Sequence, residues 1–174
     1  MKIFITGAVG SGKSTLARRI AAECGIPAVE LDDVVYIRTP EGDIKRTEEE
    51  RDALLAEKTA SGSWVAEDAG RRCFKHLWME ADLLILLDVP KGRRNFQIIT
   101  RWIKQMLRLE KCGYKPGFGW LPLMLRWSRD YDRDYEGFVS ELSACPGYLR
   151  VERADAAMEA VRGLSGECRE AYMR

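Results

Sequence analysis

Short apolar runs alternate along the chain with longer amphipathic segments. Runs typical of strands lie at residues 2–6, 28–31, 63–67 and 82–88, and a weaker one lies at 148–151. The run at 82–88 is unbroken between two aspartates, as expected for a central strand covered on both faces. Helical periodicity fills the intervals, with segments at 15–23, 48–60, 74–79, 93–109, 121–127, 130–142 and 155–161. The stretch at 34–43 has neither pattern and is expected to be irregular.

This alternation predicts an α/β protein with a doubly wound parallel sheet and right-handed crossovers. A chain of 174 residues is long enough for one domain with a mobile appendage. Ligands of such sheets gather at the carboxyl ends of the strands, so the residues that follow each strand are the first candidates for function.

The first strand leads directly into a phosphate-binding loop. Residues 7–14 read G-A-V-G-S-G-K-S, which satisfies G-x-x-x-x-G-K-[ST] between a strand and a helix. Free N–H groups at a helix N-terminus attract phosphate, Lys13 would reach the β/γ-phosphates, and the Ser14 hydroxyl would coordinate Mg²⁺. The residues expected to hold the nucleotide are Gly7, Gly10, Ser11, Gly12, Lys13, Ser14 and Thr15.

Acidic residues follow three further strands. Asp32 and Asp33 come after the second, Glu67 ends the third, and Asp88 ends the fourth. Asp32 or Asp33 could accept a hydroxyl proton or orient an acceptor, with Asp32 favoured because it follows the strand directly. Glu67 could contact Mg²⁺ through water, or cap a helix, and Asp88 could serve the site or fix the turn at Pro90.

Residues 91–129 form a basic region in which Glu110 is the only acid. A long helix at 93–109, a glycine-rich turn at 112–119 and a second helix suggest a helical hairpin, a natural lid over phosphates. Arg94 and Arg101 are candidates to stabilise charge on a transferring phosphoryl group. The helix carries two stripes at helical spacing: a basic and polar one at Arg94, Gln97, Arg101, Lys104 and Arg108, and an apolar one at Phe96, Ile99, Ile103 and Met106.

Composition narrows the class of protein. A formal net charge of +1 gives no global attraction to nucleic acid or membrane, and no apolar run has the length of a membrane span. Five scattered cysteines and one histidine, His76, make a zinc site improbable. Because the first strand enters the phosphate loop, no removable signal peptide is expected, and the expected compartment is the cytoplasm with reduced thiols.

The phosphate loop, Leu31–Asp33, the stretch 64–67, the run 82–90 and the basic hairpin together resemble adenylate-kinase-like P-loop proteins. Within that group the chain most resembles the DNA topology modulation protein FlaR-related family. The resemblance spans about residues 2–150. The loop itself is common to many NTPases, and the hairpin stretch K-C-G-Y-K-P at 111–116 is more discriminating.

This resemblance implies a three-layer P-loop NTPase fold, with a five-stranded parallel sheet flanked by helices and a helical lid insertion. It implies one kinase-like domain over 1–174, with the lid at about 91–129 and an acceptor-binding region at about 32–62. In such families an acid, a glycine and then an arginine usually follow the third strand. Here these positions hold Glu67, Asp68 and Arg71, so close backbone approach by an acceptor at position 68 is in doubt.

The expected function is Mg-dependent transfer of the γ-phosphoryl group of ATP to a small, nucleotide-like acceptor. Lys13, Asp32, Arg94 and Arg101 would act in catalysis, and Ser14 and Glu67 would hold the metal. Asp32, Asp33 and Arg71 would bind the acceptor. The alternative is an ATP-binding regulator or weak ATPase linked to DNA topology, whose basic hairpin contacts DNA; no membrane partner is expected.

Overall fold

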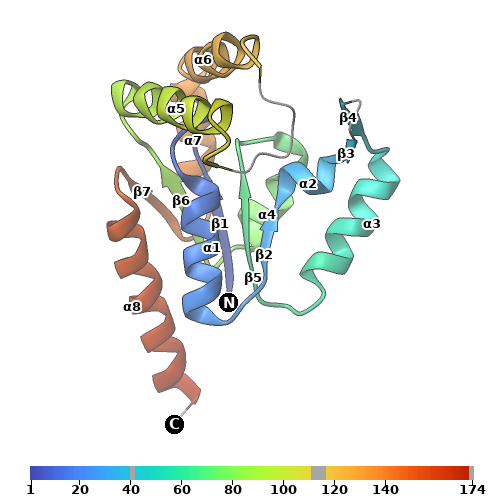
Figure 1. Cartoon of the computed structure of the whole chain (residues 1–174). Helices are drawn as coiled ribbons and strands as arrows, with labels where there is room; N and C mark the ends of the chain where they lie inside the picture. Colours follow the sequence, from blue (N-terminus) through green and yellow to red (C-terminus); the bar gives the residue numbers. More distant parts are fainter. Residues whose placement is uncertain (40–41, 111–116, 173–174) are drawn as a thin grey trace.

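A five-stranded parallel sheet forms the centre of the computed structural model, which describes residues 1–39, 42–110 and 117–172 (Figure 1). The strands lie in the order β2 (Ala28–Glu30), β5 (Trp64–Asp68), β1 (Lys2–Thr6), β6 (Leu83–Leu87) and β7 (Tyr148–Val151). Every neighbouring pair is parallel. The α/β sheet predicted from the sequence is confirmed, with the phosphate loop at the end of its middle strand.

Helices cover both faces of the sheet because successive strand residues point to opposite sides. Ile3 and Ile5 pack under α1 (Lys13–Cys24) and α8 (Ala154–Tyr172). Phe4 points the other way, into a cluster that contains Trp78. That second cluster is covered by α3 (Glu48–Thr59), α4 (Lys75–Glu80), which follows the 3₁₀ turn η1 (Arg72–Phe74), and α7 (Tyr135–Ser143).

The segment after β2 differs from the sequence-based expectation. Leu31 does not extend the strand but begins a short helix, α2 (Leu31–Val35). The stretch expected to be irregular holds an antiparallel hairpin of β3 (Tyr36–Thr39) and β4 (Gly42–Lys45), whose turn at 40–41 lies outside the described residues. Leu31, Val34 and Val35 are all buried, and their spacing suits a helical turn packed on the core better than a strand.

Arg46 secures this short helix. Its Nη1 donates to the carbonyl oxygens of Asp33, Val34 and Tyr36 at 2.6, 3.2 and 2.9 Å. These are carbonyls that the end of a helix leaves without an intrahelical partner. Arg46 therefore holds the C-terminal end of α2, and with it the position of Asp32 and Asp33.

The predicted start of α3 is confirmed. The Thr47 hydroxyl accepts from the Glu50 N–H at 3.2 Å, and the Glu50 carboxylate accepts from the Thr47 N–H at 3.0 Å. This is the capping box expected from the S/T-x-x-E pattern.

Two helices, α5 (Lys91–Met106) and α6 (Trp120–Tyr131), pack together above the carboxyl edge of the sheet (Figure 1). The helix predicted at 93–109 begins earlier and ends at Met106, with Arg108 in the left-handed region at φ 56°. The continuous helix expected at 130–142 is interrupted near Asp132–Asp134, where α6 gives way to α7. The hairpin stretch 111–116 lies outside the described residues.

The apolar stripe of α5 does not face the core. Ile98 is buried together with Arg94 and Gln105, whereas Phe96 and Ile103 are exposed. The helix therefore turns polar side chains inward and apolar ones outward, opposite to the usual arrangement. Among the described residues, no helix is long and apolar enough to cross a membrane.

Candidate active site

The phosphate loop is shaped by glycines at which a side chain would clash. A Cβ on Gly7 would lie 2.5 Å from the Leu87 carbonyl oxygen, and one on Gly10 would lie 2.7 Å from Ile98 Cγ1. Gly12, at φ 93°, precedes α1, and a Cβ there would meet no atom within 4 Å. The loop thus packs closely against β6 at Gly7 and against α5 at Gly10. At Gly12 it leaves room at the N-terminus of α1, the kind of position where anions bind.

Lys13 is buried at the start of α1. Its Nζ donates to the Ala8 carbonyl oxygen at 3.0 Å, inside the loop. Burial lowers the pKa of Lys13 below its ordinary value, although the carboxylates of Glu67, Asp68 and Asp32 act in the opposite direction. A partly desolvated ammonium group is held where phosphate oxygens would replace its weak neutral partner.

Ser14 and Glu67 meet across the site. The Ser14 hydroxyl, in the first turn of α1, donates to Glu67 Oε1 at 2.8 Å. Glu67 is the last residue but one of β5, a fully buried strand, and burial raises the pKa of its carboxyl group, despite the nearby Lys13 and the hydrogen bond from Ser14. The two residues predicted as metal ligands are therefore in contact, and a bound cation would relieve the cost of burying this carboxylate.

The residues present fit a nucleotide and Mg²⁺. The hydroxyl oxygens of Ser11 and Thr6 are buried without a hydrogen-bond partner, and Ser11 belongs to the phosphate loop. Within residues 1–39, 42–110 and 117–172, no three His, Cys, Asp or Glu side chains cluster to hold a metal. One hydroxyl and one carboxylate suit Mg²⁺, which keeps several waters and takes further oxygens from substrate phosphates.

A cavity of about 1190 Å³ opens beside the loop. It exceeds the ~300–1,000 Å³ typical of a pocket for one small ligand, so its volume leaves room for more than one small molecule. Its lining includes Asp32, Glu67 and Ala69 from the β2 and β5 side, and residues of α5 from the lid. The loop contributes residues 9–14, followed on α1 by Thr15, Leu16, Arg18 and Arg19, and the connection from β7 to α8 contributes residues 152–155.

Asp32 and Asp33 have different surroundings. Asp32 lines the cavity and accepts from Arg71 Nη2 at 2.5 Å. Asp33 accepts from Arg38 Nε at 3.3 Å and does not line the cavity. The structure therefore brings only Asp32 to Lys13 and Glu67, because α2 turns the two side chains to different sides.

Asp68 organises the turn after β5. Its carboxylate is fully buried and accepts backbone N–H groups of Gly70 and Arg71, the first at 2.7 Å, and it also pairs with the Arg71 guanidinium. Burial opposes the charge of Arg71, but Asp68 and Asp32 outweigh it and hold its pKa above the ordinary value. Asp68 thus occupies the position where resembling families have glycine and uses it to hold Arg71 against Asp32.

Part of the polar stripe of α5 faces the cavity. Gln97, Arg101 and Lys104 line it, and Arg101 Nε lies 3.5 Å from Glu110 Oε1. Arg101 thus has the position expected of a lid arginine, with a partner that phosphate could displace.

Arg94 is not brought to the cavity, contrary to the prediction. Its side chain is buried between α5 and α6, where Nη2 donates to Asp132 Oδ1 at 2.5 Å. The guanidinium also lies 5.6 Å from the ring centroid of Tyr131. Arg94 sits at the centre of the face of α5 that packs on the protein, so its side chain is drawn to these partners and not to the phosphate loop.

Asp88 has a structural environment. It accepts from the Tyr135 hydroxyl at 2.5 Å and from Arg150 Nε at 2.8 Å, and it lines a separate cavity of about 320 Å³. It joins β6, β7 and α7, which supports the interpretation that it fixes the turn before Pro90.

Several cationic side chains of the main cavity were not singled out from the sequence. Arg18 and Arg19 follow the loop along α1, Arg93 lies in the first turn of α5, and Arg153 precedes α8. Arg18 lies four residues after Ser14, which is a usable signal, because i and i+4 share a helix face. Arg153 comes from a distant segment, and no local pattern points to it.

Solved structures superpose on nearly the whole of this chain at low sequence identity. Shikimate kinase from Acinetobacter baumannii, solved in complex with shikimate, superposes with a TM-score of 0.58 at 15% identity, covering 95% of this chain and 93% of that one. TT1252 from Thermus thermophilus gives 0.59 at 16% identity, with coverages of 94% and 96%. A gluconokinase from Sinorhizobium meliloti 1021 gives 0.50 at 19% identity, with coverages of 99% and 95%.

At these identities the likeness establishes the fold. The chain has the three-layer α/β fold of P-loop kinases, with a five-stranded parallel sheet and helices on both faces. No protein-family model matches the chain, and no curated protein sequence matches it.

Proposed function

We propose that the protein is a phosphotransferase that uses Mg-ATP to phosphorylate a hydroxyl group of a small acceptor. The observation that carries this proposal is the convergence of Lys13, the Ser14–Glu67 pair and Asp32 on one cavity. Donor binding alone would need only the first three. A carboxylate beside them supplies what a hydroxyl acceptor requires.

Each residue of the site has a role that follows from its position in the cavity. Lys13 and the loop N–H groups bind the β- and γ-phosphates, and Ser14 and Glu67 hold Mg²⁺, directly and through water. When bound, Mg²⁺ neutralises charge on the phosphate oxygens. Asp32 takes the proton of the acceptor hydroxyl as its oxygen attacks phosphorus, and the bond to the ADP oxygen breaks.

Arg71 is proposed as a positioning residue for Asp32. Its guanidinium is held by the buried Asp68 and donates to Asp32 Oδ1 at 2.5 Å, so it fixes the carboxylate from behind. Arg101 and Lys104 on the lid lie across the cavity lining and stabilise charge on the transferring group. The region 32–62, with α2, the β3–β4 hairpin and α3, would hold the acceptor.

Two acceptor classes are supported by different observations. The resemblance to adenylate-kinase-like proteins favours a nucleotide or nucleoside. The solved structures named for shikimate and gluconate kinases favour a small hydroxy acid. A nucleoside and a hydroxy acid both present a hydroxyl as nucleophile, so the proposed roles of Asp32 and Lys13 are the same for these two; a nucleotide that reacts through its phosphate oxygen would not need Asp32 as a base.

ADP release from Mg-ATP, measured across nucleosides, nucleoside monophosphates and small hydroxy acids, tests the proposal. We expect one class to raise ADP release well above the rate in water. Asp32→Asn should lower that rate by about 10²–10⁴-fold, while the matched variant Asp33→Asn should retain it. Loss of rate in Asp33→Asn alone would assign the acceptor role to the other aspartate.

The alternative is an ATP-binding regulator or weak ATPase linked to DNA topology, as the FlaR-related resemblance suggests. Its support is the basic character of residues 91–129. ADP release that no small acceptor stimulates, together with salt-dependent affinity for DNA that falls when the basic residues of α5 are replaced, would favour it.

A further inference from the structure

The outer face of α5 is apolar and uncovered. Phe96, Ile99, Ile103 and Leu107 follow one another at intervals of three and four residues, so they share one side of the helix. Phe96 is 69% exposed and Leu107 63% exposed. The opposite side of the same helix buries Arg94, Ile98 and Gln105 against the protein.

Such an arrangement is unfavourable in water. Amphipathic helices of globular proteins turn the apolar stripe to the core, and contiguous exposed apolar side chains on a monomer mark an interaction surface. Here the core side is already occupied by the phosphate loop and α6, through Ile98 against Gly10 and Arg94 against Asp132. The apolar face therefore needs an apolar phase outside the chain.

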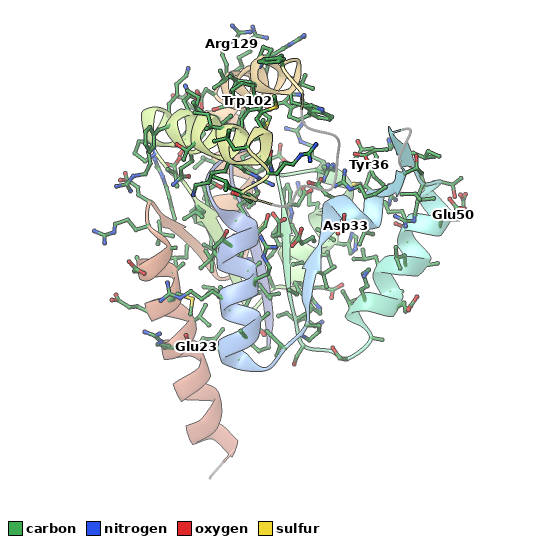
Figure 2. All side chains as sticks on the ribbon, in the orientation of Figure 1. Glu23, Asp33, Tyr36, Glu50, Trp102 and Arg129 are labelled. Carbon is green, nitrogen blue, oxygen red and sulfur yellow. The ribbon has the colours of Figure 1, made fainter. Side chains whose placement is uncertain are left out.

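Basic residues are concentrated in the segment of the sequence that carries this face. Residues 91–129 contain ten lysines and arginines and one acid, Glu110. Among the residues that the structure describes, Arg108 and Arg129 have no carboxylate within 4.0 Å, and neither lines the nucleotide cavity. Arg129 projects outward from α6 in Figure 2. The whole-chain charge of +1 conceals this concentration.

An apolar face in a basic segment of the chain favours some partners over others. A second copy of the chain would bring two basic surfaces together, and like charges across an interface cost several kcal/mol. Duplex DNA would take the cations but leave Ile99 and Ile103 uncovered. An anionic bilayer surface satisfies both, because its headgroups attract the cations and its acyl boundary accepts the apolar side chains.

We propose that the outer face of α5, formed by Ile99, Ile103 and the adjoining Leu107, with Phe96 where this face borders the nucleotide cavity, docks on the surface of a bilayer rich in anionic phospholipid. The helix lies parallel to the membrane plane and does not cross it. Gln97 and Arg101 remain turned toward the cavity, so the docked helix still lines the nucleotide site. The proposal rests on this surface alone and holds whether or not the protein is a kinase.

Sedimentation of the full chain with vesicles tests it. One set of vesicles contains phosphatidylcholine only, and the other contains phosphatidylcholine and phosphatidylglycerol in equal parts. We expect binding to the second set alone, weakened by added salt. The double variant Ile99→Ser/Ile103→Ser should bind about tenfold or more weakly, as should Arg108→Gln/Arg129→Gln.

Met79→Ser is the matched control, because Met79 is 52% exposed on α4, outside the α5–α6 hairpin. It should bind the anionic vesicles as the unaltered chain does. Failure to sediment with anionic vesicles would overturn the proposal, as would equal binding by the Ile99→Ser/Ile103→Ser variant. A dimer in light scattering that this variant abolishes would also overturn it, since a second copy would then cover the face.

Discussion

The hydroxyl of Ser14 donates to the carboxylate of Glu67 over 2.8 Å, and this contact joins the first turn of α1 to the end of β5. The two residues are 53 positions apart in the sequence. Their hydrogen bond ties the donor-binding loop to the strand end beside the acceptor region. Glu67→Gln keeps an oxygen that can accept from Ser14 but removes the charge, which makes it an informative substitution.

We expect Glu67→Gln to have opposite effects on the empty and the nucleotide-bound protein. Burial raises the pKa of Glu67, so its ionised form opposes folding at pH above that raised value. The neutral amide should therefore raise Tm at pH 7 without ligand. It should also reduce the extra Tm gained with Mg-ATP over ATP alone. A lower Tm without ligand would contradict the burial argument.

Nucleotide affinity should depend on pH through the same group. Binding of Mg²⁺ needs the carboxylate form of Glu67, so the Mg-dependent part of affinity is present above the raised pKa and is lost as pH falls through it. The loss should begin at a higher pH than for a carboxyl group at its ordinary value of 4.5. Titration calorimetry from pH 4 to 8 measures this, and Glu67→Gln should abolish that acid limb.

Lys13→Ala should abolish stabilisation by nucleotide. A ligand at a hundred times its Kd adds about 2.7 kcal/mol to the unfolding free energy, and the variant should lose most of that gain. Its fold should persist, because Lys13 Nζ has one neutral hydrogen bond, to Ala8. Lys75→Ala is the control, because the Lys75 side chain on α4 is exposed, and this variant should keep the full thermal shift. A full shift in Lys13→Ala would refute the phosphate-loop assignment.

Substitution of Arg101 should mainly affect turnover, and substitution of Arg94 should mainly affect stability. Arg101→Ala should lower turnover by about tenfold or more with little change in ATP affinity, and its half-exposed side chain should cost at most about 0.5 kcal/mol of stability. Arg94→Ala should cost about 2 kcal/mol or more, since it removes a buried side chain and its ion pair with Asp132, which keeps Lys91 as its remaining cationic partner. Urea unfolding and steady-state kinetics on both variants measure the two effects. The reverse pattern would mean that Arg94, and not Arg101, acts in turnover.

Asp68→Gly tests the replacement of the glycine found in resembling families. The carboxylate accepts from the N–H groups of Gly70 and Arg71 and pairs with the Arg71 side chain. Losing these bonds at a fully buried position should cost about 2–4 kcal/mol, seen in urea unfolding. Turnover should fall too, because Arg71 would no longer be held behind Asp32. Unchanged stability would mean that the turn does not depend on Asp68.

Gly10→Ala should disrupt the loop and the lid together. The new Cβ would fall 2.7 Å from Ile98 Cγ1 and 2.9 Å from the Arg94 carbonyl oxygen, at a φ of 77°. Thermal unfolding should show a loss of about 2 kcal/mol or more together with weaker ATP binding. Gly92→Ala, where a Cβ meets nothing within 4 Å, is the control and should be neutral or stabilising.

The sheet, the phosphate loop and the capping box at Thr47 could be predicted because each depends on residues close in sequence. The left-handed glycines, the buried run at 83–87 and the Thr47–Glu50 pair all have local signatures. The roles predicted for Lys13, Ser14, Glu67, Asp32 and Arg101 remain predictions that the geometry supports.

The errors have a common physical origin in partners distant along the chain. Helical spacing places Arg94 and Arg101 on one face, but Asp132, on the segment after α6, draws Arg94 away from the cavity. Leu31 has the residue type of a strand, yet it begins α2, whose end is held by Arg46, 13 residues after Asp33 in the sequence. The spacing of the apolar stripe of α5 does not say which side of the helix packs on the protein, and only the contact of Ile98 with Gly10 shows which side is covered.

The contact of Ile98 and the Arg94 carbonyl with Gly10 limits how α5 can move. Because Ile98 and the Arg94 carbonyl rest on Gly10, the first two turns of α5 belong to the floor of the nucleotide site and cannot swing away without disturbing the loop. Movement of α5 should therefore be restricted to the second half of the helix, where Arg101 and Lys104 lie. We therefore expect nucleotide exchange to involve movement of the second half of α5 while its first two turns stay in place.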